Sequence, residues 1–163
     1  MLSTRVLGQA PSLALDLGKY RKLFLEEAAE HLSEIGSALL ALEKDAGRSE
    51  SIDAVFRMAH STKSMAASLE YESIAQLAHA LEDRMELVRR RGHVAGGSEL
   101  SALFQGLEGL EAMVAVVRET GEPPPPRPDL ADAIRAVPAA GDAASEAASA
   151  DRLKKKLLRP PLR

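Results

Sequence analysis

Two short sequence patterns carry the residue types needed to accept a phosphoryl group and hold it in place. The first places Lys63 three residues after His60, about one helical turn away. A neutral imidazole nitrogen is a nucleophile near neutral pH, and a neighbouring ammonium group can balance the charge of a phosphate. In the second pattern, Glu82 follows His79 by three residues. A carboxylate that accepts a hydrogen bond from Nδ1–H would fix the tautomer of an imidazole and leave its Nε2 lone pair free to react.

The expected position of His60 on its helix favours this chemistry. If the apolar residues of this segment face a core, His60 points about 100° away from the centre of that face, at the border with solvent. Ser64 and Ala67 follow in nearly the same direction, and their small side chains leave the imidazole uncovered. Glu82 lies about 100° from the centre of the apolar face of the next segment. We therefore expect Glu82 to reach His60 if the two helices are antiparallel.

Four segments with apolar residues at every third or fourth position predict four helices. They span about residues 17–45, 50–69, 72–91 and 98–120. The expected N-caps are Asp16, Ser49 or Ser51, and Ser98, and the expected stops are Gly47, Gly92 and Gly121. No proline interrupts these segments, and the loops between them are short. The pattern predicts an all-α, antiparallel up-down-up-down four-helix bundle.

The remaining residues divide the chain into three parts. We expect an N-terminal extension at 1–15, the bundle at 16–120 and a Pro/Ala-rich linker at 121–163. Within the linker we expect a stiff polyproline stretch at 123–126, a short helix at 129–137 capped by Asp129, a low-complexity segment at 139–150 and a basic tail at 151–163. The tail is interpreted as a flexible, solvated segment, with a patch for an anionic partner as the less favoured alternative.

Composition excludes several classes of protein. The 163 residues include no Cys, which excludes disulfides, zinc–thiolate sites and thiol catalysis. A net charge of −3 argues against a general nucleic-acid binder. No uninterrupted apolar run reaches the length of a membrane span, and no signal peptide is evident, so we expect a cytoplasmic protein without a membrane partner. No glycine-rich phosphate loop is present, so the chain has no ATP site of its own.

Other interpretations of the polar residues remain open at this point. A lone histidine on a helix flank is more often an ordinary surface residue, and His31 and His93 are interpreted in that way. A metal site formed by His60, His79, Glu82 and Glu86 is conceivable in a helical bundle. It is the less favoured interpretation, because di-metal bundles need paired carboxylates from several helices and this chain offers one cluster. We therefore expect no metal and no cofactor in this chain.

These motifs resemble the histidine phosphotransfer (HPt) domain found at the N-terminus of CheA-type chemotaxis kinases. Residues 16–45 are similar to the first helix of that family, and residues 103–114 to its fourth. Residues 55–83 are similar to the phosphohistidine helix, the turn and the following H-x-x-E helix. The resemblance covers about residues 16–120, and residues 129–137 match the short fifth helix of the family. The combination of H-x-x-K with a downstream H-x-x-E is more specific than either motif alone.

The resemblance implies a role for each residue of the two motifs. His60 corresponds to the phosphorylated residue, Glu82 to the carboxylate that holds its tautomer, Lys63 to the lysine near the phosphoryl group and His79 to a second polar residue of that cluster. The face formed by Arg57, Ser64 and Ala67 corresponds to the partner-docking surface. The implied partners are a CheA-type kinase catalytic domain and the receiver domain of a response regulator. ATP and Mg²⁺ would belong to those partners.

The sequence departs from the family pattern at three positions. Ser64 stands where the family usually has Gly, Glu70 stands where the turn often has Gly, and Thr62 replaces an aliphatic residue. We expect the turn to close differently, because Glu tolerates a positive φ poorly, and we expect Thr62 to weaken the core slightly. An alternative function is therefore a helical interaction module that keeps the bundle without phosphotransfer. Whether the chain is a stand-alone carrier or the front of a longer kinase stays open.

Overall fold

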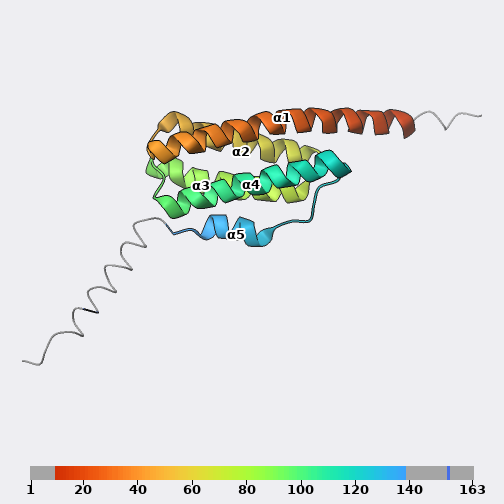
Figure 1. Cartoon of the computed structure of the whole chain (residues 1–163). Coiled ribbons are helices and arrows are strands. Elements are labelled where there is room, and N and C mark those ends of the chain that lie inside the picture. Colours follow the sequence, from red (N-terminus) through yellow and green to blue (C-terminus); the bar gives the residue numbers. More distant parts are fainter. Residues whose placement is uncertain (1–9, 139–153, 155–163) are drawn as a thin grey trace, which may run out of the picture.

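Five helices make up the described part of the chain. The computed structural model describes residues 10–138 and Lys154, with side chains from Asp16 onward. The helices are α1 (Ala10–Lys44), α2 (Ser49–Ser68), α3 (Glu72–Arg91), α4 (Gly97–Thr120) and α5 (Pro128–Ala136). The first four alternate in direction, α1 packs against α4 to close the bundle, and α5 lies along α3 and α4 (Figure 1). The predicted all-α bundle is confirmed. The low-complexity segment and, apart from Lys154, the basic tail lie outside the described residues.

The predicted apolar faces of the four helices meet in one core. Its fully buried members include Ile35, Leu39, Val55, Ala59, Ile74, Leu81, Met85, Leu103, Leu110 and Val117. Because each helix is fixed in rotation by these residues, the polar side chains beside the core face are fixed in direction as well. Phe56, at the edge of its stripe, is only partly buried. Thr62 is fully buried, and its hydroxyl donates to the Met58 carbonyl at 2.8 Å, so this polar group is satisfied inside the core.

Helix α1 begins earlier than the sequence predicts. It starts at Ala10 instead of about Leu17, so the prediction that Asp16 caps it is wrong. The intervening residues contain no Gly, and Pro11 is the second residue of the helix, where a missing N–H costs nothing. Nothing in this segment therefore stops the helix from extending. In Figure 1 this part of α1 projects beyond the other helices.

The predicted N-caps of the other helices are also wrong. The observed N-caps are Arg48 for α2, Gly96 for α4 and Arg127 for α5, and none makes a side-chain cap hydrogen bond. Other interactions determine these helix starts. At α4 the carboxylate of Glu99, in the first turn, accepts the N–H of Ala95 in the preceding loop at 2.6 Å and so ties the loop to the start of the helix. At α5, Pro128 favours a helical φ at the first position, one residue before the expected start at Asp129.

The predicted ends of α3 and α4 are confirmed. Gly92 has a φ of 89°, and its N–H donates to the Val88 carbonyl. Gly121 has a φ of 79°, and its N–H donates to the Val117 carbonyl. Both residues adopt the left-handed conformation that Gly reaches without steric cost, and both satisfy a carbonyl that the helix leaves without a partner.

The turn between α2 and α3 closes in the way that the family glycine would allow, although Glu70 stands there. Glu70 has a φ of 61°. The Tyr71 N–H donates to the Ala66 carbonyl at 2.8 Å, and the Glu70 N–H donates to the Ala67 carbonyl at 3.0 Å. This is a Schellman motif with a non-glycine residue at its left-handed position. The expectation that the turn closes differently is therefore wrong. The ring of Tyr71 packs edge-on against the ring of Phe24, with the ring centroids 5.2 Å apart, and this contact joins the turn to α1.

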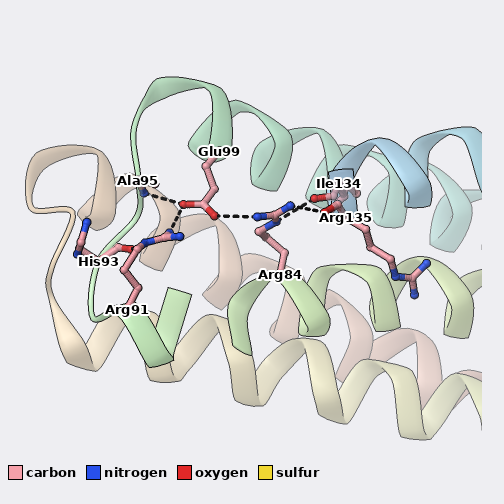
Figure 2. A network of polar contacts seen from close by, with 7 residues as sticks. All are labelled: Arg84, Arg91, His93, Ala95, Glu99, Ile134 and Arg135. Atoms are coloured by element: carbon pink, nitrogen blue, oxygen red, sulfur yellow. Dashed lines mark hydrogen bonds and ion pairs between the residues drawn. The ribbon is translucent and has the colours of Figure 1, made fainter. Parts of the chain in front are cut away.

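A buried arginine fastens α5 to the bundle (Figure 2). Arg84 of α3 is 3% exposed. Its Nε donates to the Ile134 carbonyl at 2.9 Å, and its Nη2 donates to the Arg135 carbonyl. These two carbonyls belong to the last turn of α5, where the helix cannot satisfy them itself. The guanidinium therefore takes the place of a C-cap for α5.

The same arginine pairs with a buried glutamate of α4. Glu99 is 1% exposed, and its Oε1 lies 3.2 Å from Arg84 Nη1. Its other oxygen accepts hydrogen bonds from Arg91 and from the Ala95 N–H. Every charged group in this cluster has a partner, as burial of charge requires. Sequence analysis missed the cluster, because no residue pattern indicated that two charges would enter the core together.

Helix α5 lies directly on two glycines of α4. A Cβ atom added at Gly109 would lie 2.8 Å from a methyl carbon of Leu130, and one added at Gly106 would lie 3.0 Å from a methyl carbon of Ile134. Both distances are shorter than a normal carbon–carbon contact. The missing side chains therefore allow α5 to approach α4 closely.

Helix α4 is long and apolar enough to cross a bilayer by length and composition, with a mean hydropathy of 1.4 over an 18-residue window. The expectation from uninterrupted apolar runs missed this window. Half of the window is buried inside the bundle, and Leu103, Leu110 and Val117 belong to the core. Its place among the other helices accounts for the apolar character of α4.

Candidate functional site

The imidazole of His60 stands on the flank of α2 and is held at one nitrogen. Its side chain is 54% exposed, and Nδ1 lies 2.8 Å from Glu82 Oε1 on α3. An ionised carboxylate can only accept, so the neutral imidazole carries its proton on Nδ1 and donates it to Glu82. The Nε2 lone pair then stays available as a nucleophile. The structure thus brings together the two residues that the helix geometry predicted to meet.

The Glu82 carboxylate lies between the His60 imidazole and the Lys63 ammonium group. Its side chain is 14% exposed, and Lys63 Nζ lies 2.6 Å from Oε2. Burial raises the pKa of Glu82, but the short contacts from Lys63 and His60 and the positive charge of Lys63 outweigh this effect. The net pKa of Glu82 lies below its ordinary value of 4.5. Glu82 is therefore ionised at neutral pH and able to stabilise positive charge on the imidazole.

In the described part of the chain, His79 forms no hydrogen bond or ion pair with His60 or Glu82. Its Nε2 lies 3.3 Å from Asp83 Oδ1, and its side chain is about half exposed. It lines a hollow of about 290 Å³ between α2 and α3, together with Lys63 and Ser64. The structure therefore places His79 beside the predicted cluster, on the side of Lys63, with Asp83 as its direct partner.

The predicted docking residues form one open strip along α2. Arg57, His60, Ser64 and Ala67 are all exposed and follow one another at intervals of three or four residues. The Arg57 Nε donates to the Asp53 carbonyl one turn earlier, at a long distance of 3.4 Å. The small residues Ser64 and Ala67 leave the C-terminal side of His60 uncovered. A protein surface could therefore approach the imidazole along this strip.

Two further residues near His60 were missed by sequence analysis. The ring of Phe56 stacks beside the imidazole, with centroids 6.5 Å apart and planes inclined by 18°. The guanidinium carbon of Arg89 lies 4.3 Å from the centroid of the Phe56 ring. A signal was available, because Arg89 follows Glu82 by seven residues and therefore lies on the same flank of α3. Phe56 falls on the apolar face of its segment, where its spacing indicates a core residue.

The alternative metal cluster is not assembled in the described part of the chain. The structure groups no three His, Asp or Glu side chains there in a way that could hold a metal ion. His79 pairs with Asp83, and Glu86 pairs with Arg89 and Arg90. Two of the four candidate ligands thus have partners outside the group, while His60 and Glu82 contact each other. The polar residues at this site therefore form ion pairs, and the imidazole of His60 stays exposed.

Sequence comparison finds one domain family and a group of chemotaxis proteins. The model of the Hpt domain family matches residues 19–120. The chain is 33% identical over 89 residues to the chemotaxis protein CheA of Halobacterium salinarum, covering 55% of this chain and 13% of that protein. It is 33% identical over 94 residues to CheA of Bacillus subtilis, covering 58% of this chain and 14% of that protein. The chain thus spans about a seventh of the length of these relatives.

Solved structures with the same architecture come from the same group. The solution structure of the histidine phosphotransfer domain of CheA has a TM-score of 0.61 and 30% identity, covering 72% of this chain and 90% of that one. The phosphorylated P1 domain of CheA3 in complex with CheY6 from R. sphaeroides has a TM-score of 0.66, covering 72% of this chain and 93% of that one. At 24% identity, the second likeness concerns the fold.

Proposed function

Because the chain belongs to the Hpt domain family, we propose that it is a phosphoryl carrier in a chemotaxis-like two-component pathway. His60 accepts the phosphoryl group from a CheA-type kinase catalytic domain and passes it to an Asp of a response-regulator receiver domain. The observation that carries this proposal is the 2.8 Å contact between His60 Nδ1 and Glu82 on an otherwise exposed imidazole. This contact supports the tautomer of His60 that has its proton on Nδ1 and its lone pair on Nε2.

The first transfer follows from this tautomer. The Nε2 lone pair attacks the γ-phosphorus of ATP held by the kinase, the Nε2–P bond forms, and the bond from phosphorus to the β–γ bridging oxygen breaks as ADP leaves with its electron pair. No proton needs to leave Nε2. The ring becomes positively charged, and the ionised Glu82 at Nδ1 stabilises that charge. Lys63, on the other oxygen of Glu82, supplies a positive charge for the phosphoryl oxygens.

The second transfer reverses the charge on the ring. A carboxylate oxygen of the receiver Asp attacks phosphorus, and the N–P bond breaks with its electron pair returning to Nε2. The imidazole is then neutral again, with its proton still on Nδ1. The exposed strip of Arg57, Ser64 and Ala67 is the surface on which we expect both partners to dock. His79, beside Lys63, contributes a polar side chain to the edge of this surface.

The partners supply the components that this chain is not expected to hold. ATP belongs to the kinase domain and Mg²⁺ to the kinase and receiver domains, so the carrier needs no cofactor of its own. We infer that transfer takes place in the cytoplasm, where ATP is available. We further infer that residues 16–120 act as the carrier domain and that the residues following 120 link it to other parts of the pathway.

Phosphorylation assays test this proposal. The full chain is incubated with a CheA-type kinase catalytic domain and ATP labelled at the γ-phosphate. We expect a label that is labile in acid and stable in base, that disappears in His60→Gln, and that moves to an added receiver domain. His93→Gln is the matched control, because His93 lies exposed in the α3–α4 loop and should leave the label intact. A native chain that takes no label would favour the phosphotransfer-inactive interaction module.

A further inference from the structure

The imidazole of His60 has an aromatic neighbour on its own helix. Phe56 lies four residues earlier on α2, and the two ring planes are inclined by only 18° at a centroid distance of 6.5 Å. Offset, nearly parallel aromatic rings whose centroids lie about 4.5–7 Å apart attract one another beyond the effect of their burial. Phe56 therefore gives the imidazole a flat neighbour on the side opposite Ser64.

Arg89 holds Phe56 in this position from the neighbouring helix. Its guanidinium carbon lies 4.3 Å from the Phe56 ring centroid. The guanidinium is itself held from both helices, because Nε lies 3.3 Å from Asp53 on α2 and Nη1 lies 3.6 Å from Glu86 on α3. A cation over the face of an aromatic ring is attracted by the ring even at an exposed site. Arg89, Phe56 and His60 thus form a short series in which each side chain lies beside the next.

The stacking of Phe56 beside His60 restrains a rotation of the imidazole that the contact with Glu82 leaves free. A hydrogen bond at Nδ1 fixes the proton and one edge of the imidazole, but the ring can still rock about the line from Nδ1 to Glu82 Oε1. The Nε2 lone pair lies in the plane of the ring, so rocking turns the lone pair away from phosphorus. Correct alignment of a nucleophile can contribute several powers of ten to a rate. A neighbour that limits rocking would therefore favour the transfer step.

We propose that Phe56 and Arg89 are positioning residues for phosphotransfer at His60. Phe56 holds the plane of the imidazole, and Arg89 holds Phe56, while Glu82 independently sets the tautomer. Neither residue contacts the reacting atoms. The inference rests on the proposed function of His60, and its test therefore includes a measurement that needs no kinase.

Steady-state phosphorylation separates positioning from docking. We expect Arg89→Gln and Phe56→Leu each to lower kcat for labelling of the full chain about three- to ten-fold, with KM for the carrier unchanged. Arg89→Lys should recover most of the loss, because an ammonium group also binds the ring face. Arg90→Gln is the matched control, since Arg90 is 73% exposed and its described ion pair is with Glu86 alone. A rise in KM at constant kcat, or an equal loss in Arg90→Gln, would overturn the proposal.

NMR of the unphosphorylated chain gives the independent measurement. In Arg89→Gln and Phe56→Leu we expect greater mobility of the His60 ring carbons and unchanged nitrogen shifts, because the tautomer is set by Glu82. In Glu82→Gln we expect the nitrogen shifts to change. If the ring mobility is the same in all Arg89 and Phe56 variants as in the native chain, the positioning role is excluded. That result would stand whether or not the native chain takes a label, so it differs from a failure of the proposed function.

Discussion

The two oxygens of the Glu82 carboxylate contact different groups. This division explains how one residue can both set the tautomer of His60 and stabilise positive charge on its ring. Oε1 faces the imidazole and Oε2 faces Lys63. The lysine keeps the carboxylate ionised, and the ionised carboxylate keeps the imidazole proton on Nδ1. When the ring becomes positive, the same carboxylate is already in place to stabilise it. The charge is therefore positioned before the reaction and needs no rearrangement during it.

Replacement of this carboxylate by an amide isolates the role of its charge. In Glu82→Gln the amide oxygen can still accept the Nδ1 proton, but it cannot compensate the imidazolium. We expect the initial rate of labelling by a CheA-type kinase domain to fall about ten-fold or more, while the helical circular dichroism stays native. Glu111→Gln, on the exposed side of α4, serves as the control and should keep the native rate. An unchanged rate in Glu82→Gln would remove Glu82 from the mechanism.

The lowered pKa of Glu82 also predicts how stability depends on pH. A carboxyl group whose pKa is lower in the folded state than in the unfolded state stabilises the fold above its unfolded pKa. This contribution is lost as the pH falls below 4.5 and through the folded pKa. We expect urea denaturation to show that the stability advantage of the native chain over Glu82→Gln shrinks between about pH 5 and pH 3. An advantage that stays the same through this range would contradict the ionised state of Glu82.

The positions of His60, Lys63 and Glu82 could be predicted from the sequence because they depend on helical spacing. The period of a helix fixes the flank on which His60, Lys63 and Glu82 lie, and antiparallel packing then brings the flanks together. The stacking of Phe56 and Arg89 depends on side-chain rotamers and on the exact rotation of α3 against α2, which spacing does not determine. His79 shows the same limit. It lies on the predicted flank, but its direct partner is Asp83.

At the scale of the elements, helix ends were predicted better than helix starts. Gly92 and Gly121 end their helices through a conformation that other residues reach only at a cost, so the sequence signal is strong. A helix can begin in several ways. α4 begins after Gly96, with Glu99 bound to the preceding loop, and α5 begins at Pro128, where we expected Ser98 and Asp129 as caps. Such alternatives weaken any single cap signal.

The left-handed residue in the α2–α3 turn predicts a simple way to stabilise the protein. A non-glycine residue in this conformation costs about 1–2 kcal/mol. Part of the gain from Gly is offset by the greater entropy of its unfolded chain. We therefore expect Glu70→Gly to raise the free energy of unfolding by about 0.5–1 kcal/mol, measured by urea denaturation.

The control is the same substitution within a helix. Glu111→Gly on the exposed face of α4 should lower the free energy of unfolding by about 1 kcal/mol, because Gly has a poor helix propensity. If Glu70→Gly destabilises the chain as much as Glu111→Gly does, the turn does not hold Glu70 in the left-handed region.

At the scale of the whole molecule, the cluster around Arg84 connects three helices and one loop. Arg84 of α3 binds the end of α5, and Glu99 of α4 binds both Arg84 and the α3–α4 loop at Ala95 (Figure 2). The fold class followed from apolar periodicity alone. The attachment of α5 did not, because it depends on two charges buried together and on close approach at Gly109.

Loss of one charge in this cluster should destabilise the whole bundle. Glu99→Gln leaves the buried Arg84 and the partly buried Arg91 without a compensating charge, so we expect a loss of about 3 kcal/mol in the free energy of unfolding. The double variant Arg84→Met with Glu99→Gln should recover part of this loss, because one of the buried charges that lost its partner is then removed. Thermal and urea denaturation of the single and double variants measure both effects. A single variant within about 0.5 kcal/mol of the native chain would contradict the charge assignment.

The hydrogen bonds from Arg84 to the last carbonyls of α5 also determine where the polypeptide leaves the bundle. Arg84 and Glu82 are two residues apart on α3, so one helix carries both the contact at this exit point and the contact to the His60 imidazole. A tether that begins at a rigid root explores a volume set by its own length and stiffness. For a domain joined through such a tether, the effective concentration of that domain near the His60 imidazole would depend on the length and stiffness of the tether. Movement of the point where the tether begins would add little to it.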